Sequence, residues 1–547
     1  MDVSRRTLIG SIPSAMFAAG AWGSVLDPVT TTEAGSVRGM VVGGVQIYRG
    51  VPYAGSVSGA NRFRRAPAAE AWAGVFDARL PGAPSIQSPG GTFGLHEPAP
   101  SEDCLNLTIW TPANDRKRRP VMFYNHGGGF SSGSSASVLQ DGANLARLYD
   151  VVVVATNHRL GLLGYLYLDE VAGADYSGSG NCGLSDIVQG LHWVSRNIAK
   201  FGGDPANVMI FGESGGGAKT SCLYAMPSAS PYFTKASIES GPGIRMTDRD
   251  AAAELTNRVL RTLGIARRDW RRLLEVPTAK LLKVQIELSG NVTSRALGGP
   301  QSSGLPLLVF SPVVDSKVLP VHPFDPVAPS ISREKPLMVG YNRDEAAFFG
   351  FVSSDVSMFN VDMAGLRERL KPLFPDYEQI ITVYMRSRPS ASPADILIAV
   401  LSAGFAGNGS IAIAERKAEQ HGQPVYAYVF DYPLEVTMPG ARRPLGPMHA
   451  LDIPFKFDNV DVAMRGSVLA GARPERHAAS RAMSEMWSTF ARTGVPGAAG
   501  QPRWPRYTLD RRETMMIDAE CRVVTDPFEE ERTFWATRSP CRVSVTP

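Results

Sequence analysis

The stretch from Asn207 to Gly217 reads NVMIFGESGGG, and it decides the fold. Its first five residues form an apolar run without alternation, which is typical of a strand buried on both faces of a sheet. The segment Gly212-Glu-Ser-Gly-Gly216 follows at once and matches the G-x-S-x-G pattern, in which a sharp turn between a strand and a helix presents a serine. Glycine suits both ends of this turn, because a larger side chain would collide with the backbone. We therefore predict that Ser214 is a nucleophile at the end of a strand.

Other apolar runs in the chain predict further strands of the same kind. They are Val121–Tyr124, Val151–Ala155, Leu337–Val339 and Val425–Phe430. Between the second of these runs and Ser214, apolar residues at spacings of three and four predict a helix that begins at Ser185-Asp186 and ends before Gly202-Gly203. Strand, helix and strand in this order favour a mostly parallel sheet, in which ligands bind at the carboxyl ends of the strands. The predicted fold class is therefore α/β, with helices on both faces of the sheet and long loop insertions.

A glycine-rich loop follows the first of these strands. Its sequence, His126-Gly-Gly-Gly-Phe130, is typical of an oxyanion-hole loop, because glycines let the backbone come close to a substrate oxygen. We predict that the N–H groups of Gly128, Gly129 and Gly215 bind the oxyanion, and that His126 holds the loop in place. The alternative of a phosphate-binding loop is disfavoured, because the lysine and the serine or threonine of a P-loop are missing.

The composition excludes several classes of protein. The 547 residues are 44% hydrophobic and 20% charged, which excludes disordered, collagenous and coiled-coil chains. The net charge of +4 is spread over scattered residues, so nucleic acid is not an expected partner. Five cysteines without a C-x-x-C or Cys/His cluster indicate neither a disulfide framework nor a metal site.

The amino terminus has the pattern of an export signal. Residues 1–26 place Arg5 and Arg6 before a short apolar stretch that ends at Ala19-Gly-Ala21, a pattern similar to the twin-arginine signals of bacteria. The alternative is a frayed tail in which the two arginines occur by chance. No other segment is apolar for 18 residues, so we expect no stable membrane anchor and a soluble mature chain that is periplasmic or secreted. We expect residues 27–547 to form one domain.

Several longer motifs extend the pattern over nearly the whole chain. They are YRGVPYA (48–54), SEDCLNLTIWTP (101–112), HGGGF (126–130), NHRLGLLGYL (157–166), the stretch 180–217, GYNRDEAAFF (340–349), GPMHALDIPFKF (446–457) and MWSTFARTGVP (486–496). With these motifs the sequence resembles the type-B carboxylesterases, a family of the α/β-hydrolase fold that includes cholinesterases and bacterial para-nitrobenzyl esterases.

The resemblance implies a catalytic triad of Ser214, Glu345 and His449. Both partners of the serine follow predicted strands, as the serine itself does. Asp344 is the rival for the acid, but we expect it to orient a loop. The other histidines after Ser214 are expected at the surface; they are His322, His421 and His477.

The resemblance also implies roles for two residues near the triad. Glu213 matches a position beside the serine where a carboxylate would place negative charge near the histidine; the alternative is a buried carboxylate held by hydrogen bonds. Ser240 matches a serine that lies close to the acid in relatives, and its alternative is an ordinary serine at a strand end. No metal ion or organic cofactor is implied.

Three positions depart from the family pattern. Gly215 stands where many relatives have alanine, which keeps the backbone donor, so activity should survive. Cys104 lies in a motif where relatives often form a disulfide, but Ser85 occupies the position of its partner. The segment from Ser88 to Gly94 has no tryptophan, so no preference for choline esters is expected.

Cys182 and Cys222 are expected to be packed thiols, whereas Cys521 and Cys541 could pair if the protein is exported.

These features predict a hydrolase that cleaves small-molecule carboxylic esters through an acyl-enzyme. The triple-glycine loop of related esterases leaves room for bulky alcohol groups, so we expect tertiary alcohol esters to be accepted. The alternatives are an amide, carbamate or lactone hydrolase with the same triad and, less favoured, a non-catalytic binding protein of cholinesterase type. We expect a monomer or a weak homo-oligomer.

Overall fold

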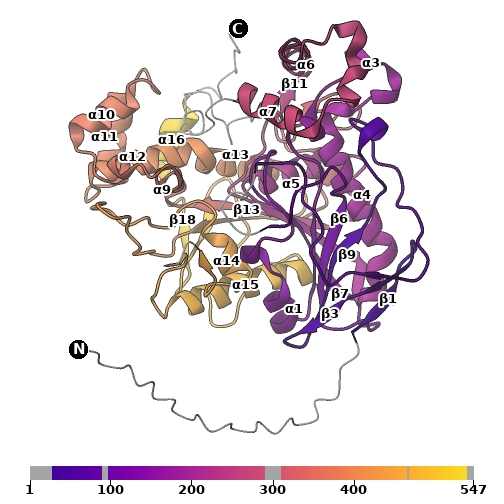
Figure 1. Cartoon of the computed structure of the whole chain (residues 1–547). Coiled ribbons are helices and arrows are strands. Elements are labelled where there is room, and N and C mark those ends of the chain that lie inside the picture. Colours follow the sequence, from indigo (N-terminus) through magenta and orange to yellow (C-terminus); the bar gives the residue numbers. More distant parts are fainter. Residues whose placement is uncertain (1–26, 89–96, 290–308, 465–466, 539–547) are drawn as a thin grey trace, which may run out of the picture.

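The computed structural model describes residues 27–88, 97–289, 309–464 and 467–538. Their centre is an eleven-stranded sheet in the order β18-β17-β14-β13-β10-β9-β7-β8-β6-β4-β3 (Figure 1). All neighbouring strands from β8 to β17 run parallel, whereas β18, β6, β4 and β3 run antiparallel to their neighbours. The prediction of a mostly parallel sheet is therefore confirmed.

The strands of this sheet have the following bounds: β3 Met40–Val42, β4 Val45–Pro52, β6 Asn106–Thr111, β7 Arg119–Asn125, β8 Val152–Thr156, β9 Gly203–Glu213, β10 Lys235–Glu239, β13 Leu337–Asn342, β14 Val425–Phe430, β17 Glu513–Ile517 and β18 Arg522–Thr525. Three small sheets are formed by β1 Val29–Thr31, β2 Ser36–Arg38 and β5 Val75–Asp77, by β11 Thr247–Asp248 and β12 Val313–Val314, and by β15 Ala463–Met464 and β16 Ser467–Val468. All five apolar runs predicted as strands are strands.

Helices cover both faces of the sheet. They are α1 Ala143–Tyr149, α2 Gly161–Tyr165, α3 Asp169–Ala172, α4 Cys182–Asn197, α5 Gly215–Ala225, α6 Arg249–Leu263, α7 Thr278–Ser289, α9 Ala347–Ser353, α10 Met363–Leu370, α11 Tyr377–Ser387, α12 Pro393–Ser402, α13 Asn408–Glu419, α14 Asp452–Lys456, α15 Arg476–Thr493 and α16 Glu529–Ala536. Figure 1 shows α4 and α6 on the right, α10 to α12 on the left, and α14 and α15 below.

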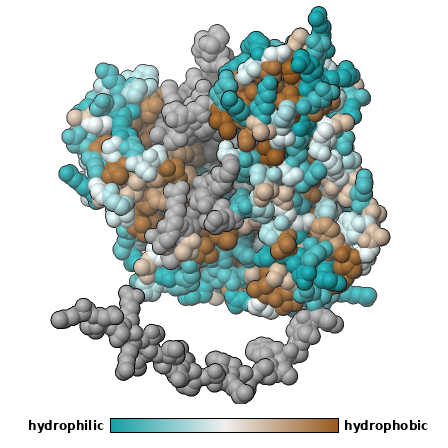
Figure 2. All heavy atoms as spheres, in the orientation of Figure 1, coloured by the Kyte–Doolittle hydropathy of each residue, from teal (hydrophilic) through white to brown (hydrophobic). Residues whose placement is uncertain are grey.

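Alternation along the central strands builds a separate core on each face. In β7, Val121 and Phe123 pack into the core that includes residues of α4 and α5, whereas Met122 and Tyr124 pack into the core that includes residues of α1 and α15. Every residue of β7 is buried, because the strand is covered from both sides. Figure 2 shows that polar residues prevail on the outer surface of the flanking helices, with apolar residues scattered among them.

The predicted start of one helix is wrong. Helix α4 begins at Cys182, three residues before the predicted cap at Ser185-Asp186. Asp186 does not cap the helix, because its two carboxylate oxygens accept hydrogen bonds from the guanidinium of Arg159 at 2.8 and 2.7 Å. This buried ion pair fastens α4 to the segment that follows β8.

A second expectation, that no other segment is apolar over 18 residues, is also wrong. The helical run Pro393–Glu419, which joins α12 and α13 through a π-helical turn, is long and apolar enough to cross a membrane by length and composition. However, 78% of its most apolar window is buried inside the protein. The apolar composition is therefore that of a core helix.

The cysteines agree with the sequence as far as the structure describes them. Cys104, Cys182 and Cys222 are buried free thiols. Cys104 interacts with Ser85, the residue at the position of the missing disulfide partner. Cys541, the segment 89–94 and the signal-like residues 1–26 lie outside the described residues, so the expectations that concern them stay predictions.

Candidate active site

Ser214 occupies a strained turn between β9 and α5. Its backbone has φ 59° and ψ −125°, angles that a residue with a side chain adopts only when its surroundings enforce them. The turn presses against β7: a Cβ atom at Gly216 would lie 1.9 Å from the carbonyl oxygen of Asn125, and one at Gly212 would lie 2.6 Å from it. Glycine at both positions is therefore required, and the turn holds the serine hydroxyl at the carboxyl edge of the sheet.

Two hydrogen bonds join Ser214 to the residues expected as its partners. The Nε2 atom of His449 lies 2.8 Å from the Ser214 hydroxyl, and its Nδ1 atom lies 2.6 Å from Oε2 of Glu345. Glu345 follows β13, whereas His449 lies in the loop between β14 and α14. Sidechains separated by 235 and 104 positions in the chain thus form one continuous line of hydrogen bonds.

Backbone contacts fix the acid and the histidine relative to each other. The N–H of Asn342, the last residue of β13, donates to Oε1 of Glu345 at 2.8 Å. Its side-chain amide donates to the carbonyl oxygen of Met448, also at 2.8 Å. Because one asparagine holds both the carboxylate and the residue before His449, the geometry of the pair is determined before any substrate binds.

The charge around His449 favours its protonated form. Oε1 of Glu213 lies 3.3 Å from Nδ1 of His449, on the same side as Glu345. Burial alone would lower the pKa of His449, but the negative charges of Glu213 and Glu345 outweigh burial and raise that pKa to about 9. For the carboxylic acid of Glu213 burial has the opposite effect: it raises the pKa, although the positive charge of His449 acts to lower it. The site therefore stabilises the imidazolium that a general base becomes.

Aromatic rings surround the histidine, a feature that the sequence analysis missed. The ring centroids of Phe405, Phe348 and Phe349 lie 4.9, 5.4 and 6.5 Å from that of His449. Phe405 belongs to the π-helical turn Ala403–Gly407, and such turns are frequent at functional sites. A break of helical periodicity within a long apolar helix leaves no clear sequence pattern, so this residue could not be found from the sequence.

The glycine loop lies directly against the turn that carries Ser214. Gly128 and Gly129 have φ of 85° and 63°, a conformation that favours glycine. A Cβ atom at Gly215 would lie only 2.1 Å from the carbonyl oxygen of Gly129. An alanine methyl group at this position would therefore displace the loop in this chain. The expectation that activity survives with glycine at this position stays a prediction.

The remaining sequence candidates lie outside the hydrogen-bonded line. His126 is buried, and its Nδ1 contacts the carbonyl oxygen of Gly127 within the glycine loop. The carboxylate of Asp344 accepts a hydrogen bond from Arg443 at 2.8 Å, which agrees with a role in holding a loop. The Ser240 N–H donates to Gly340, but its buried hydroxyl has no hydrogen-bond partner. The side chain of His322 is only 14% exposed, so it is less accessible than expected.

A buried cluster of charges lies behind the triad. Lys456 pairs with Glu239 and, at 3.2 Å, with Asp452, and all three side chains are fully buried. Asp452 in turn accepts from the side chain of Asn342 at 3.1 Å, which connects the cluster to Glu345. Positions 239 and 456 are far apart in the chain, so no local pattern could reveal this pairing.

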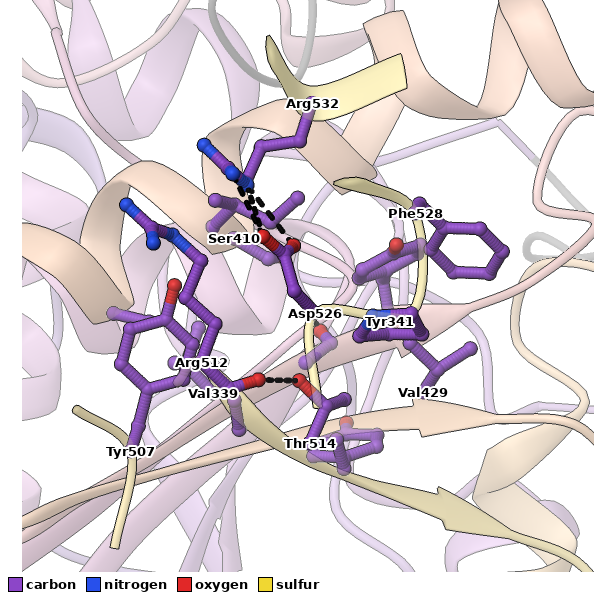
Figure 3. A pocket seen from close by; sticks show the side chains of 16 residues that line it. Val339, Tyr341, Ser410, Val429, Tyr507, Arg512, Thr514, Asp526, Phe528 and Arg532 are labelled. Carbon is purple, nitrogen blue, oxygen red and sulfur yellow. Dashed lines mark hydrogen bonds and ion pairs between the residues drawn. The ribbon is translucent and has the colours of Figure 1, made fainter. Parts of the chain in front are cut away.

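A small cavity lies at another part of the sheet, between β13, β14, β17 and α13 (Figure 3). Its volume of about 30 Å³ suits roughly one or two water molecules. None of the triad residues lines it, and its two arginines are neutralised, Arg532 by Asp526 at 2.7 Å and Arg512 by Glu415 at 3.1 Å.

Within the described ranges, no three His, Cys, Asp or Glu side chains are grouped as a metal site.

The contact between Gly215 and Gly129 gives a first prediction. We expect Gly215→Ala to lower kcat about 10- to 100-fold, because the new methyl group would push an oxyanion donor out of place, and loss of one donor costs about 100- to 1,000-fold. The matched control is Gly497→Ala, since a Cβ at Gly497 meets no atom within 4 Å. Equal kcat values for Gly215→Ala and the wild type would show that the loop adapts.

The carboxylate beside His449 gives a second prediction. His449 must be neutral to accept a proton, and the charge of Glu213 favours the protonated form. Removal of that charge in Glu213→Gln should lower the pKa of His449, so the acid limb of the profile of kcat/KM against pH should move to lower pH. A pH series on both enzymes with one ester measures this shift. A limb that stays in place, or moves to higher pH, contradicts the assigned electrostatics.

The sequence matches the family model described as "Carboxylesterase family" over residues 26–535. The para-nitrobenzyl esterase of Bacillus subtilis (strain 168) is 34% identical over 510 residues, which cover 92% of this chain and 97% of the relative. The phenmedipham hydrolase of Pseudarthrobacter oxydans is 31% identical over 502 residues, with coverage of 90% and 95%.

Solved structures agree with these sequence matches. A carboxylesterase of Geobacillus stearothermophilus has a TM-score of 0.79 and 35% identity and covers 93% of this chain and 99% of its own. A structure named PNB esterase has a TM-score of 0.74 and 31% identity, with coverage of 92% and 99%. The predicted α/β-hydrolase fold and the predicted resemblance are confirmed. The chain belongs to the carboxylesterase family and is a carboxylic-ester hydrolase.

Proposed function

We propose that Ser214 is the nucleophile of this ester hydrolase, His449 its general base and Glu345 the carboxylate that orients the histidine. The observation that carries the proposal is the continuous line of two hydrogen bonds from the Ser214 hydroxyl through the imidazole to Glu345. A serine hydroxyl is a weak nucleophile by itself and needs an adjacent base that removes its proton as it attacks.

The reaction proceeds in two matched halves. As the Ser214 oxygen bonds to the ester carbonyl carbon, its proton passes to Nε2 of His449. The carbon–oxygen bond to the alcohol then breaks, and His449 returns the proton to the leaving alcohol. Water attacks the acyl-enzyme by the same sequence and releases the acid and the free serine. Glu345, with Glu213 nearby, stabilises the imidazolium in both halves.

The oxyanion of each tetrahedral intermediate would be bound by backbone N–H groups. The loop that contains Gly128 and Gly129 lies against Gly215, the first residue of α5, so all three N–H groups belong to neighbouring peptides. The amino end of α5 adds the partial positive charge of its helix dipole at the same place. The triad residues do not distinguish esters from amides, carbamates or lactones, so these substrates stay alternatives.

Export and assembly are proposed on the sequence alone. We infer that residues 1–26 direct the enzyme out of the cytoplasm, because they follow the twin-arginine pattern. The enzyme would then act on small-molecule esters outside the cytoplasm, as a monomer or a weak homo-oligomer without a stable membrane anchor.

The role of Ser214 has a direct test. We expect the mature enzyme to hydrolyse para-nitrophenyl acetate and butyrate, and Ser214→Ala and phenylmethylsulfonyl fluoride each to abolish this activity, because both remove the nucleophile. Ser195→Ala serves as the control and should keep its activity, because Ser195 lies on α4 and its hydroxyl donates only to the carbonyl oxygen of His192. Hydrolysis that persists in Ser214→Ala would assign the nucleophile to another residue.

The glycine loop also supports a proposal about the alcohol group. We propose that bulky, even tertiary, alcohols are accepted, because Gly127 places no side chain beside the nucleophile. A Cβ at Gly127 would lie 3.4 Å from that of Ser214, so a side chain there would occupy the space next to the reacting ester. We therefore expect hydrolysis of tert-butyl acetate, and a greater loss of this activity than of para-nitrophenyl acetate hydrolysis in Gly127→Ala. Cleavage of para-nitrophenyl acetate without cleavage of the tert-butyl ester would contradict the proposal.

A further inference from the structure

Lys219 is a buried cation one turn into helix α5. Its side chain has no exposed surface. Its Nζ atom donates to the carbonyl oxygen of His126 at 2.9 Å and lies 5.9 Å from the centre of the Phe130 ring. Burial lowers the pKa of Lys219 to about 7, and among the described residues no carboxylate opposes this effect. A buried charge without a counter-ion is costly, so its presence calls for an explanation.

Two other buried lysines of this chain have carboxylates that oppose the cost of burying their charge. Lys456 is paired with two carboxylates. Lys417 donates to the carbonyl oxygens of Ser332 and Arg333, at 3.1 and 2.7 Å, and the charge of Glu334 opposes the effect of burial on its pKa. Lys219 alone of these three has no opposing negative charge.

The contacts of Lys219 enclose the glycine loop. His126 precedes the three glycines, and Phe130 follows them, so the lysine touches the loop at both ends. The next residue of α5, Thr220, accepts a hydrogen bond from the side chain of Asn125 at 3.0 Å. The helix that begins at the nucleophile is thereby fastened to the loop that faces it.

We propose that Lys219 is a positioning residue of the oxyanion hole: it holds the peptide of His126 so that the glycine N–H groups face the reacting carbonyl, and its positive charge favours the oxyanion. This role rests on the proposed acyl-enzyme mechanism. Among the described residues, the contacts of Lys219 are with His126 and Phe130 at the two ends of the loop, so the lysine acts through the loop. Because Lys219 is buried, its positive charge is screened far less than it would be in water.

The surroundings of Lys219 determine how its effect depends on pH. The titratable groups that face it are His126 and His158, whose rings stack at 4.5 Å. Burial, with the Lys219 charge adding to it, lowers the pKa of both histidines well below the usual value, so both stay neutral. The charge at this place therefore belongs to Lys219 and is lost as pH rises through the pKa of the lysine.

The test compares the wild type with Lys219→Met, Lys219→Arg and Lys417→Met. For hydrolysis of para-nitrophenyl acetate, we expect Lys219→Met to lower kcat about 10- to 100-fold with little change in KM, since loss of a direct oxyanion donor costs about 100- to 1,000-fold. Lys219→Arg keeps the charge and should restore part of the loss. The ratio of wild-type to Lys219→Met activity should fall as pH is raised from 6 to 9.

Lys417→Met controls for the removal of any buried lysine, because it changes a similar set of carbonyl contacts away from the glycine loop. The rate at which a fluorophosphonate labels Ser214 gives a second readout, and Ser214→Ala shows which residue is labelled. Wild type that fails to label overturns the acyl-enzyme mechanism, and this inference with it. Equal labelling rates and kcat for wild type and Lys219→Met, or equal losses in Lys219→Met and Lys417→Met, overturn the role of Lys219 alone.

If Lys219→Met does not fold, the pH profile of Lys219→Arg is compared with that of the wild type. Because arginine stays charged, this variant should not lose activity as pH rises through the pKa of the lysine, and identical profiles contradict the proposal.

Discussion

The close packing of the Ser214 turn against the end of β7 is the constraint on which the rest of the site depends. Gly216 fits against the carbonyl of Asn125 only because it has no side chain, and Gly215 fits against Gly129 for the same reason. These contacts bring the nucleophile and the glycine loop from neighbouring strands to one place. The energy that holds Ser214 at positive φ is supplied by the sheet around it, since each flanking strand is buried on both faces.

The register of the sheet extends this constraint to the other site residues. Asn125 pairs with Gly212, Glu213 with Glu239, and Asn342 with Phe430, so the strands that carry the site end at a common edge. Loops that leave this edge then deliver Glu345 and His449 to the serine. The buried carboxylates of Glu213 and Glu345 lie beside His449, while Lys456 pairs with those of Glu239 and Asp452. Negative charge thus stabilises the imidazolium, and Lys219 places positive charge against the glycine loop.

Local features of the site could be predicted from the sequence, but long-range features could not. The strand before Ser214 and the glycine loop are visible because each is a short pattern with a steric reason. Glu345 and His449 follow strands, but their choice over Asp344 and other histidines came from the resemblance. No sequence pattern predicts the pairing of Lys456 with Glu239 or the contact of Phe405 with His449, because each joins segments that meet only after folding. The predicted start of α4 was wrong because an aspartate beside an apolar run can be either a helix cap or a member of a buried ion pair, and Asp186 is the latter.

The central claim is that the edge of the sheet makes Ser214 a nucleophile that carries the acyl group during turnover. Mass spectrometry of the wild-type enzyme, acid-quenched within milliseconds of mixing with para-nitrophenyl butyrate, tests this most directly. The account predicts a mass increase of one butyryl group on the peptide that contains Ser214, and none in Ser214→Ala treated in the same way. Turnover of the ester with no adduct on that peptide, or with an adduct on another residue, would contradict it.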